Sequence, residues 1–361
     1  MNAQQIEEFE IGAIRPPSEG GSHSLLLRFT RNCPWSRCTF CYGTPYGRGK
    51  FELRSVGEIK MDIDRAKAIS NMIEEAASQH GRGGGITAAV LDALFLKYPE
   101  ARYSNSFVNV LNWMNAGAKT VFIQDANSLI MKTADLVEAI RYLKQTFPGI
   151  ERITSYARSK TVAKKSLENM IAIREAGLSR LHMGLETGDD PLLKKIRKGV
   201  SAEEHVEAGR KILEAGIELS EYIMPGLGGK EMTDQHALHT ALVLNRIDPH
   251  YIRSRTFAPI AGTPLADDYL RGDFQFLKPH ELIREIGRLI EHLDVHSRLC
   301  FDHATNPCYR SPTGLRYLFH QGYEGYRMPE EKEHLLSIVE QGLRIDEGLF
   351  PKVEEMAMMA R

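Results

Sequence analysis

The sequence has few cysteines and almost no net charge, and each of these shortages excludes a class of protein. Its 361 residues include five cysteines, an odd number, of which three lie between residues 33 and 41. Cysteines distributed in this way do not form the disulfide framework of a small secreted domain. The 46 basic and 47 acidic side chains give a formal net charge of −1, so the chain lacks the strong positive charge of a dedicated nucleic-acid binder.

Long apolar runs are missing as well. The first 20 residues are polar and acidic, without the apolar core of a signal peptide. No apolar run approaches the roughly 20 residues that cross a bilayer. We therefore expect a cytoplasmic protein with no membrane partner and no dedicated nucleic-acid-binding module.

The clustered cysteines are the most informative feature that is present. An apolar stretch that begins at Ser24 runs directly into Cys33, Cys38 and Cys41, with the spacing C-x4-C-x2-C. Short loops can return three thiolates to one metal centre. Tetrahedral zinc and a cubane [4Fe–4S] cluster each take four ligands, and no fourth cysteine or histidine follows at a comparable spacing. The pattern predicts a metal centre with one open position, or a structural zinc site completed by a distant histidine such as His182 or His303.

A repeat inside the chain predicts the fold. A helical segment ends at a glycine, and a short β run follows at once, at Gly117, Gly177 and Gly216. Counting the stretch before the cysteines, six β runs alternate with helices, and the other five are residues 120–124, 152–156, 180–185, 217–223 and 251–257. Such alternation indicates a parallel sheet with right-handed crossovers. We predict an α/β fold, an incomplete (β/α)6 TIM-like barrel, with a doubly wound open sheet as the alternative.

The chain divides by pattern into three segments. We expect an irregular arm over residues 1–22, the partial barrel over 23–265, and a helical C-terminal extension over 266–361. Helices in the last segment should begin at Pro279 and Pro329. Within the barrel, Ser55 and Glu58 form the pattern of a capping box that opens a helix, and this helix should end at His80.

In barrels of this kind, the active site forms at the C-terminal ends of the strands. In this chain those ends are polar or rich in glycine: Gln124–Asp125, Ser155–Arg158, Glu186 and the run from Met224 to Gly229. Because the preceding strands are apolar, the polar ends are candidates for ligand binding. Acids at strand ends also cap the following helix, so Asp125 and Glu186 have this second interpretation.

The cysteine stretch resembles the radical S-adenosylmethionine (radical SAM) superfamily, whose usual motif is C-x3-C-x2-C at the end of the first barrel strand. The chain has one additional residue in the first gap. The branch that it resembles most contains anaerobic coproporphyrinogen oxidase and Elongator-like Fe–S oxidoreductases. The resemblance implies that Cys33, Cys38 and Cys41 hold a [4Fe–4S] cluster whose open iron binds S-adenosylmethionine. Cleavage would give a 5′-deoxyadenosyl radical, with electrons from a donor such as flavodoxin or ferredoxin.

The same resemblance implies roles for particular residues. Phe40 would lie against the adenine, Asp125 with Gln124 would hold the methionyl amine, and Glu186 would contact the ribose or the amine. Lys198 would bind the methionyl carboxylate. The remaining candidates for cofactor binding are Ser155, Arg158, Ile223, Gly226 and Phe257.

A polar loop over residues 297–308 is the candidate for the substrate side. His303, flanked by Asp302 and Asn306, is a candidate catalytic group that would clamp or protonate a substrate. We expect neither a cobalamin-binding domain nor a second cluster, which leaves a small or medium organic substrate. The alternatives are a radical methyltransferase that uses two molecules of S-adenosylmethionine, and a zinc-binding structural or interaction protein without catalysis.

Overall fold

The computed structural model describes residues 6–14, 23–81, 83, 85–352 and 355, and they form two compact units. Unit 1 comprises Met1–Pro34, Gly49–Tyr156 and Ile171–Arg180, and unit 2 comprises Trp35–Arg48, Ala157–Met170 and Leu181–Arg361. Most of the expected N-terminal arm, namely residues 1–5 and 15–22, lies outside the described residues. The division at residues 22 and 265 stays a prediction.

The order of the strands in the main sheet follows their order in the chain. It is β1-β4-β5-β6-β7-β8-β9-β12, and β6 has residues in both units. The bounds are Leu25–Arg28 (β1), Thr120–Gln124 (β4), Arg152–Ala157 (β5), Leu178–Glu186 (β6), Glu218–Ile223 (β7), Tyr251–Ser254 (β8), Arg298–Cys300 (β9) and Tyr326–Arg327 (β12). A doubly wound sheet reverses its strand order at a switch point, and this order does not reverse. The α/β class and the partial barrel are therefore confirmed.

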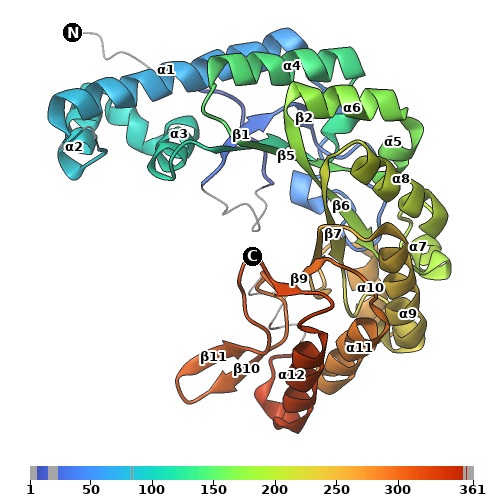
Figure 1. Ribbon diagram of the computed structural model, residues 1–361. Coiled ribbons are helices and arrows are strands. Elements are labelled where there is room, and N and C mark those ends of the chain that lie inside the picture. The colour runs from blue at the N-terminus through green and yellow to red at the C-terminus, as the bar shows by residue number, and fades with distance from the viewer. Residues whose placement is uncertain (1–5, 15–22, 82, 84, 353–354, 356–361) are drawn as a thin grey trace. The chain divides into compact units, whose positions relative to one another are not determined.

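Unit 1 contains the first strands of the sheet and the long helix α1. β1 pairs with β4 in parallel from Leu25↔Val121 to Arg28↔Gln124, and β4 pairs with β5 in parallel. α1 (Val56–His80) begins at the predicted capping box and packs against α2 (Ala88–Lys97), α3 (Asn105–Asn115) and α4 (Thr133–Thr146), as the upper part of Figure 1 shows. The short strands β2 (Thr30–Arg31) and β3 (Glu52–Leu53) pair antiparallel, and in the chain they come before and after the cysteine loop.

The glycines of the repeat all have a left-handed backbone conformation. The φ angles of Gly117, Gly177 and Gly216 are 91°, 128° and 72°, all in the left-handed region that L-residues with a Cβ rarely adopt. They follow α3, α6 (Leu167–Ala176) and α8 (Ala202–Glu214), and β4, β6 and β7 begin directly afterwards. Each glycine therefore ends one helix and directs the chain into the next strand.

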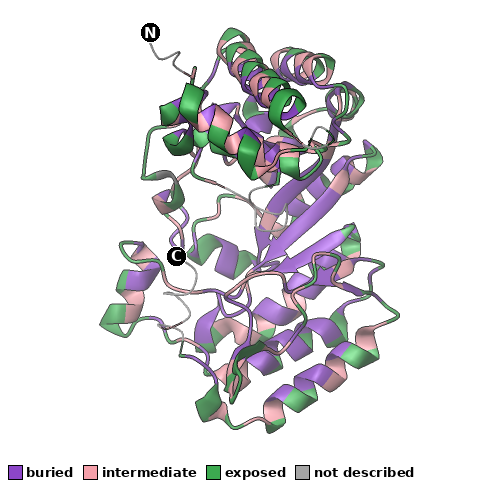
Figure 2. Ribbon diagram, turned by 90° about the vertical axis from the view of Figure 1, so that its left-hand side faces the viewer, coloured by how far each residue is buried: buried purple, intermediate pink, exposed green. Residues whose placement is uncertain are grey.

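Unit 2 contains the later strands and their covering helices. β7 pairs with β8 in parallel from Ser220↔Tyr251 to Ile223↔Ser254, and β8 pairs with β9 in parallel. The helices are α5 (Ser159–Lys164), α7 (Asp190–Lys195), α8, α9 (Gly229–Ile247), α10 (Pro264–Arg271), α11 (Pro279–His292) and α12 (Lys332–Arg344). α11 packs against α9 and α12. In Figure 2 the strands are buried along most of their length, as parallel strands covered by helices should be.

The segment after residue 265 contains more β structure than its sequence predicts. The expected helices are present as α11, which begins at Pro279 as predicted, and α12, which begins at Lys332 and not at Pro329. β9 and β12 also join the main sheet. β10 (Cys308–Ser311) and β11 (Gly314–Tyr317) form a separate antiparallel pair. These strands have two to four residues each, too few for an alternating pattern to be recognised.

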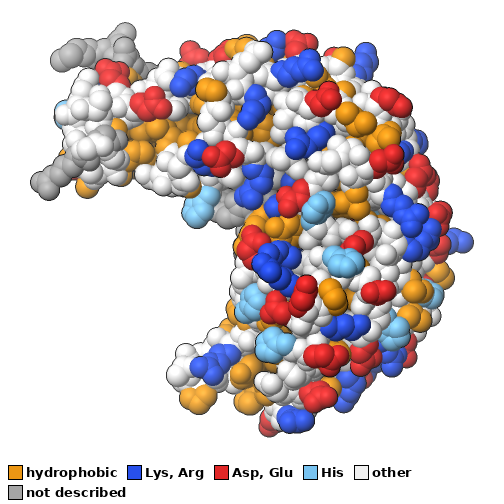
Figure 3. Space-filling model, in the orientation of Figure 1, with side chains coloured by type: hydrophobic (Ala, Val, Ile, Leu, Met, Phe, Trp, Pro, Cys, Tyr) orange, Lys and Arg blue, Asp and Glu red, His pale blue; other side chains and the backbone are white. Residues whose placement is uncertain are grey.

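The described helices include none with the length and apolar character required to span a membrane. On the face shown in Figure 3, Lys and Arg side chains are interspersed with Asp and Glu. This mixture is what a net charge of −1 predicts.

Candidate functional site

The cysteine loop makes a tight turn in unit 2. The amides of Cys41 and Tyr42 donate hydrogen bonds to the carbonyl oxygen of Cys38, at 3.2 and 2.7 Å. A turn with this i to i+3 bond aligns the side chains at its two ends, so Cys38 and Cys41 lie on one side of the loop. No disulfide joins any of the five cysteines, all of which are among the described residues. The chemistry of the three thiols fits the ligand set of a cluster.

The described residues contain no ready-made site for a single metal ion. Among the described residues, no three His, Cys, Asp or Glu side chains are placed to hold one metal ion, and neither His182 nor His303 completes such a group. Cys33 belongs to unit 1, and Cys38 and Cys41 belong to unit 2, so the expectation that the three thiolates meet at one centre stays a prediction. In a cubane cluster each cysteine binds a different iron, so the three thiolates need not ligate one ion.

A short segment before α8 holds the cysteine loop in place. The Thr39 amide donates to the carbonyl oxygen of Ile196 at 2.9 Å, and the Trp35 indole N–H donates to that of Arg197 at 2.7 Å. Gly199 has a φ of 74°, and a Cβ there would lie 2.5 Å from the Trp35 ring. The close approach therefore requires glycine, and it fixes the neighbouring residue, Lys198, beside the loop.

Arg158, one of the predicted cofactor residues, supports the same arrangement. Its guanidinium donates to the carbonyl oxygen of Lys198 at 2.8 Å and lies 5.0 Å from the centre of the Trp35 ring. A cation over an aromatic face is attracted by the ring quadrupole. Arg158 therefore positions Lys198 and Trp35.

Lys198 forms an ion pair with Glu186 at the end of β6. Nζ lies 2.7 Å from Oε1, and the two side chains are only 13% and 12% exposed. Glu186 has a φ of 65°, a strained conformation for a residue with a Cβ, and such strain occurs preferentially at functional sites. A Cβ at Gly184 would lie 2.1 Å from Glu186 Oε1 and 3.0 Å from Lys198 Nζ. The pair thus occupies space that only glycine at 184 leaves open.

The charges around Lys198 keep its side chain protonated. Burial alone would lower the pKa of this ammonium, but the Glu186 carboxylate and the Cys38 sulfur outweigh burial, and the pKa is raised. Lys198 Nζ also lies 5.7 Å from the centre of the Phe40 ring. A fixed cation and a fixed anion therefore lie next to the loop that carries Cys38 and Cys41.

An apolar cluster adjoins this ion pair. It contains Cys38 and Phe40 from the loop, Phe257 after β8, and further buried side chains, Leu192, Ile196, Leu227, Leu265 and Phe274. The Phe257 amide donates to the carbonyl oxygen of Pro225 at 2.8 Å. These side chains offer a dry, partly aromatic surface next to the two fixed charges.

The loop after β7 contains two further predicted residues. The carbonyl oxygen of Ile223 accepts a hydrogen bond from the Arg255 amide at 2.9 Å. Gly226 has a φ of 85°, and its amide donates to Glu285 at 2.6 Å. Burial raises the pKa of the Glu285 carboxyl above its usual value, although the groups that hydrogen-bond to the carboxylate act in the opposite direction. Glu285 and β8 therefore hold the loop in shape from two sides.

The predicted residues of unit 1 contact other protein groups. The Gln124 side chain accepts from the Gly12 amide at 2.8 Å and donates to the Gly12 carbonyl at 3.0 Å. Asp125 is buried, and its Oδ2 accepts from Arg28 Nη2 at 2.6 Å and from the Asn32 amide at 2.8 Å. The Ser155 hydroxyl donates to a carbonyl oxygen of β4. Asp125 therefore orders the chain directly before Cys33, and its role in cofactor binding stays a prediction.

The three predicted catalytic residues each have a separate side-chain partner. Asp302 forms an ion pair with Arg253, whose side chain is fully buried. Asn306 donates to the carbonyl oxygen of Ser254 at 3.0 Å, and His303 Nδ1 lies 2.8 Å from the Thr305 hydroxyl. Asp302 and Asn306 thus fasten the loop to β8, and the catalytic role of all three residues stays a prediction.

His303 is neutral at physiological pH. Burial, with a smaller contribution from the charge of Arg255, lowers its pKa from 6.5 to about 4. A neutral imidazole can orient a substrate through a hydrogen bond, but at pH 7 it holds no proton that it readily donates.

The lowered pKa of His303 predicts that the folded protein loses stability in acid. The unfolded chain binds a proton at His303 near pH 6.5 and the folded chain only near pH 4. The stability that the neutral His303 side chain contributes to the folded state is therefore fully present above pH 6.5. This contribution is lost as the pH falls towards 4, by about 3 kcal/mol in total. In anaerobic urea titrations at pH 7.5 and 4.5, His303→Gln should lose less stability on acidification than the wild type. His292→Gln, at an exposed histidine, should behave like the wild type; an unchanged pH dependence in His303→Gln would contradict the assignment.

Sequence reasoning missed three residues that shape this site: Trp35, Gly184 and Glu285. Glu285 had a detectable signal, because it occupies the apolar face of α11 with Leu282 and Ile286, where a charged residue is out of place. Trp35 and Gly184 had none, because their importance lies in contacts with Gly199 and Lys198.

Comparisons with known proteins match a central part of the chain that includes Glu186 and Lys198. Residues 97–241 match the family model of the Radical SAM superfamily. The tRNA uridine(34) acetyltransferase of Methanocaldococcus infernus is 23% identical over 126 residues, which cover 35% of this chain and 23% of that protein. The tRNA-2-methylthio-N(6)-dimethylallyladenosine synthase of Hahella chejuensis is 26% identical over 265 residues, covering 73% of this chain and 49% of that protein.

The crystal structure of methylornithine synthase aligns with a TM-score of 0.43 and 17% identity, over 77% of this chain and 67% of that one. The aligned regions span about a quarter and about half of the lengths of the two curated relatives.

Proposed function

We propose that this chain is a radical SAM enzyme that holds a [4Fe–4S] cluster with Cys33, Cys38 and Cys41, because residues 97–241 match the family model of the Radical SAM superfamily, whose enzymes use this cluster and S-adenosylmethionine. When bound, the cluster supplies the electron that splits S-adenosylmethionine into methionine and a 5′-deoxyadenosyl radical, which removes a hydrogen atom from the substrate. The electron donor would be a protein such as flavodoxin or ferredoxin. A cytoplasmic location would provide the reducing conditions that free thiols require.

The observation that supports this proposal most directly is the ion pair of Glu186 and Lys198 beside Cys38. The methionyl group of S-adenosylmethionine carries an ammonium and a carboxylate. Lys198 can bind that carboxylate, and Glu186 can accept hydrogen bonds from that ammonium, so the internal pair would be exchanged for two charge-assisted contacts. Neither charge would then be left buried without a partner.

The apolar cluster supplies the second requirement of the reaction. Phe40 and Phe257 offer flat apolar surfaces against which an adenine ring can pack. A site that excludes water also protects a reactive radical from side reactions. In this proposal the loop after β7, held by Glu285 through Gly226, closes one side of the adenine position.

We propose a small or medium organic substrate that approaches the loop of Asp302, His303 and Asn306. His303 would orient it as a neutral hydrogen-bonding group. Both curated relatives described above are named for reactions on tRNA, so tRNA belongs among the test substrates, and the absence of a nucleic-acid-binding module remains our prediction.

Anaerobic reconstitution tests the proposed function. Protein incubated with iron and sulfide should turn brown, and after reduction with dithionite it should show an electron paramagnetic resonance signal that changes on addition of S-adenosylmethionine. Chromatography should then detect 5′-deoxyadenosine. Tight binding of zinc without uptake of iron would overturn the proposal in favour of the zinc-binding alternative. S-adenosylhomocysteine formed together with 5′-deoxyadenosine would indicate the methyltransferase alternative.

A further inference from the structure

Unit 2 contains a cavity of about 450 Å³ that the proposed reaction does not use. It is lined by the segment from Tyr269 to Leu282, by Pro307 and Cys308 opposite, and by residues 350–352, with Lys230 from the first turn of α9. Its volume lies within the range of small-molecule sites, about 300–1,000 Å³. The Glu186–Lys198 pair is not among its lining residues.

One wall of the cavity is aromatic. Tyr269 and Phe276 pack edge to face with ring centres 4.5 Å apart, and Phe274 and Phe276 do so at 5.1 Å. Phe350 contributes another ring to the lining. Rings fixed by their neighbours in this way present flat, rigid surfaces, and such surfaces favour a flat apolar ligand.

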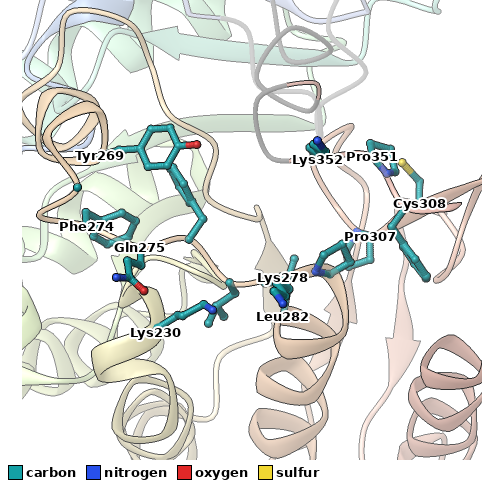
Figure 4. Close-up of a pocket in the computed structure, with 15 residues that line it drawn as sticks. Lys230, Tyr269, Phe274, Gln275, Lys278, Leu282, Pro307, Cys308, Pro351 and Lys352 are labelled. Atoms are coloured by element: carbon teal, nitrogen blue, oxygen red, sulfur yellow. The ribbon is translucent and has the colours of Figure 1, made fainter. Parts of the chain in front are cut away.

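The charged groups that line the cavity are all of one sign. They are Lys230, Lys278 and Lys352, and within the described part of the chain no Asp or Glu lines it. Figure 4 shows them on different sides of the cavity, with Lys352 across from Lys230 and Lys278. Lys230 lies 3.4 Å from Glu281. Among the described residues, neither Lys278 nor Lys352 forms an ion pair, and both are exposed.

Aromatic walls and ammonium groups together define the chemistry of an occupant. A neutral apolar molecule would use none of the three ammonium groups, and a small inorganic anion would leave the rings uncovered. From this complementarity we propose that the cavity binds a flat apolar anion, with its ring system against Phe274 and Phe276 and its acidic group at Lys230 and Lys278.

The cavity adjoins the apolar cluster that contains two residues of the cysteine loop. Phe274 lines the cavity and also belongs to the apolar cluster that contains Cys38 and Phe40. A ligand against Phe274 would therefore contact a side chain of that cluster directly. This binding site is inferred only from the cavity and its lining, so the inference does not depend on the proposed function.

Two fluorescent probes test the proposal on the full-length protein. 1-Anilinonaphthalene-8-sulfonate is a flat apolar anion, and N-phenyl-1-naphthylamine has the same rings without the sulfonate. The anion should bind saturably, with one molecule per chain. Lys230→Gln and Lys278→Gln should each weaken it about fivefold, as expected for a charge pair at a partly exposed site, while binding of the neutral probe stays within about twofold. Phe276→Ala should weaken both probes about tenfold.

Lys164→Gln is the matched control, because Lys164 is an exposed lysine of the same unit outside the cavity lining. It should leave the affinity for both probes unchanged. Circular dichroism establishes that each variant is folded, and the lysine variants, at exposed positions, keep the test valid if Phe276→Ala unfolds. Equal affinity of the anion for wild type and both lysine variants would overturn the proposal, as would equal losses for the two probes in those variants.

Discussion

Replacement of any one of Cys33, Cys38 and Cys41 by alanine will abolish the iron–sulfur cluster and the cleavage of S-adenosylmethionine. With two thiolates left, a cubane that already has one open corner would expose two. The expected loss is complete, because the cluster is the group proposed to supply the electron for cleavage. Iron and sulfide content, the visible absorption of the reconstituted protein and the yield of 5′-deoxyadenosine measure it.

Cys300→Ala is the matched control for loss of a thiol. Cys300 is fully buried in β9, and burial raises its pKa to about 12, although Arg253 opposes the shift. A thiol with so high a pKa is a poor ligand at neutral pH. The variant should therefore keep the full iron content. Full cluster content in any of the three single variants would remove that cysteine from the ligand set.

The fold could be predicted from local sequence because its signals are local. The capping box of Ser55 and Glu58 specifies the start of α1 through contacts three residues apart. Gly117, Gly177 and Gly216 mark helix ends through their own backbone conformation. Strand β12, with two residues, and its partner β9, with three, carry no such local signal, and their pairing depends on contacts distant in sequence.

The candidate site could be predicted only in part, for the same reason. From the sequence, Glu186 can be placed at the end of a strand and Lys198 after a short helix. The distance of 2.7 Å between their charged atoms could not be predicted from it. The contact needs the open space at Gly184 and the left-handed backbone of Glu186. Conversely, Gln124 and Asp125 look like ligand groups in the sequence, and the structure shows that they contact Gly12, Arg28 and Asn32.

Lys198→Met will weaken the binding of S-adenosylmethionine without loss of the cluster. The substitution removes the cation proposed to bind the methionyl carboxylate, and a hydrogen bond to a charged group contributes about 1.5–3 kcal/mol. The dissociation constant should rise by one to two orders of magnitude. Lys195→Met is the matched control, because Lys195 is an exposed lysine three residues away that pairs with Glu231. Equilibrium dialysis of the reconstituted proteins measures both affinities.

The double variant Glu186→Gln, Lys198→Met distinguishes a role of the pair in binding S-adenosylmethionine from a role in stability alone. Each single variant leaves one largely buried charge without its partner, which costs up to about 3–5 kcal/mol of stability, less the relief from partial exposure. The double variant removes both charges and should recover most of that stability. If the pair only supports the fold, affinity for S-adenosylmethionine will return together with stability. We expect stability to return and affinity to stay low.

Gly184→Ala tests the position of the two charges, because this substitution keeps both charges and changes only where they lie. The added Cβ would lie 2.1 Å from Glu186 Oε1 and 3.0 Å from Lys198 Nζ, so the flexible ends of both side chains must move. The protein should fold and hold its cluster, since the displaced atoms belong to side chains and not to the backbone. Displaced charges no longer match the ammonium and carboxylate of the methionyl group, so binding should weaken at least tenfold, by about 1.4 kcal/mol. Wild-type affinity in this variant would show that the pair does not contact S-adenosylmethionine.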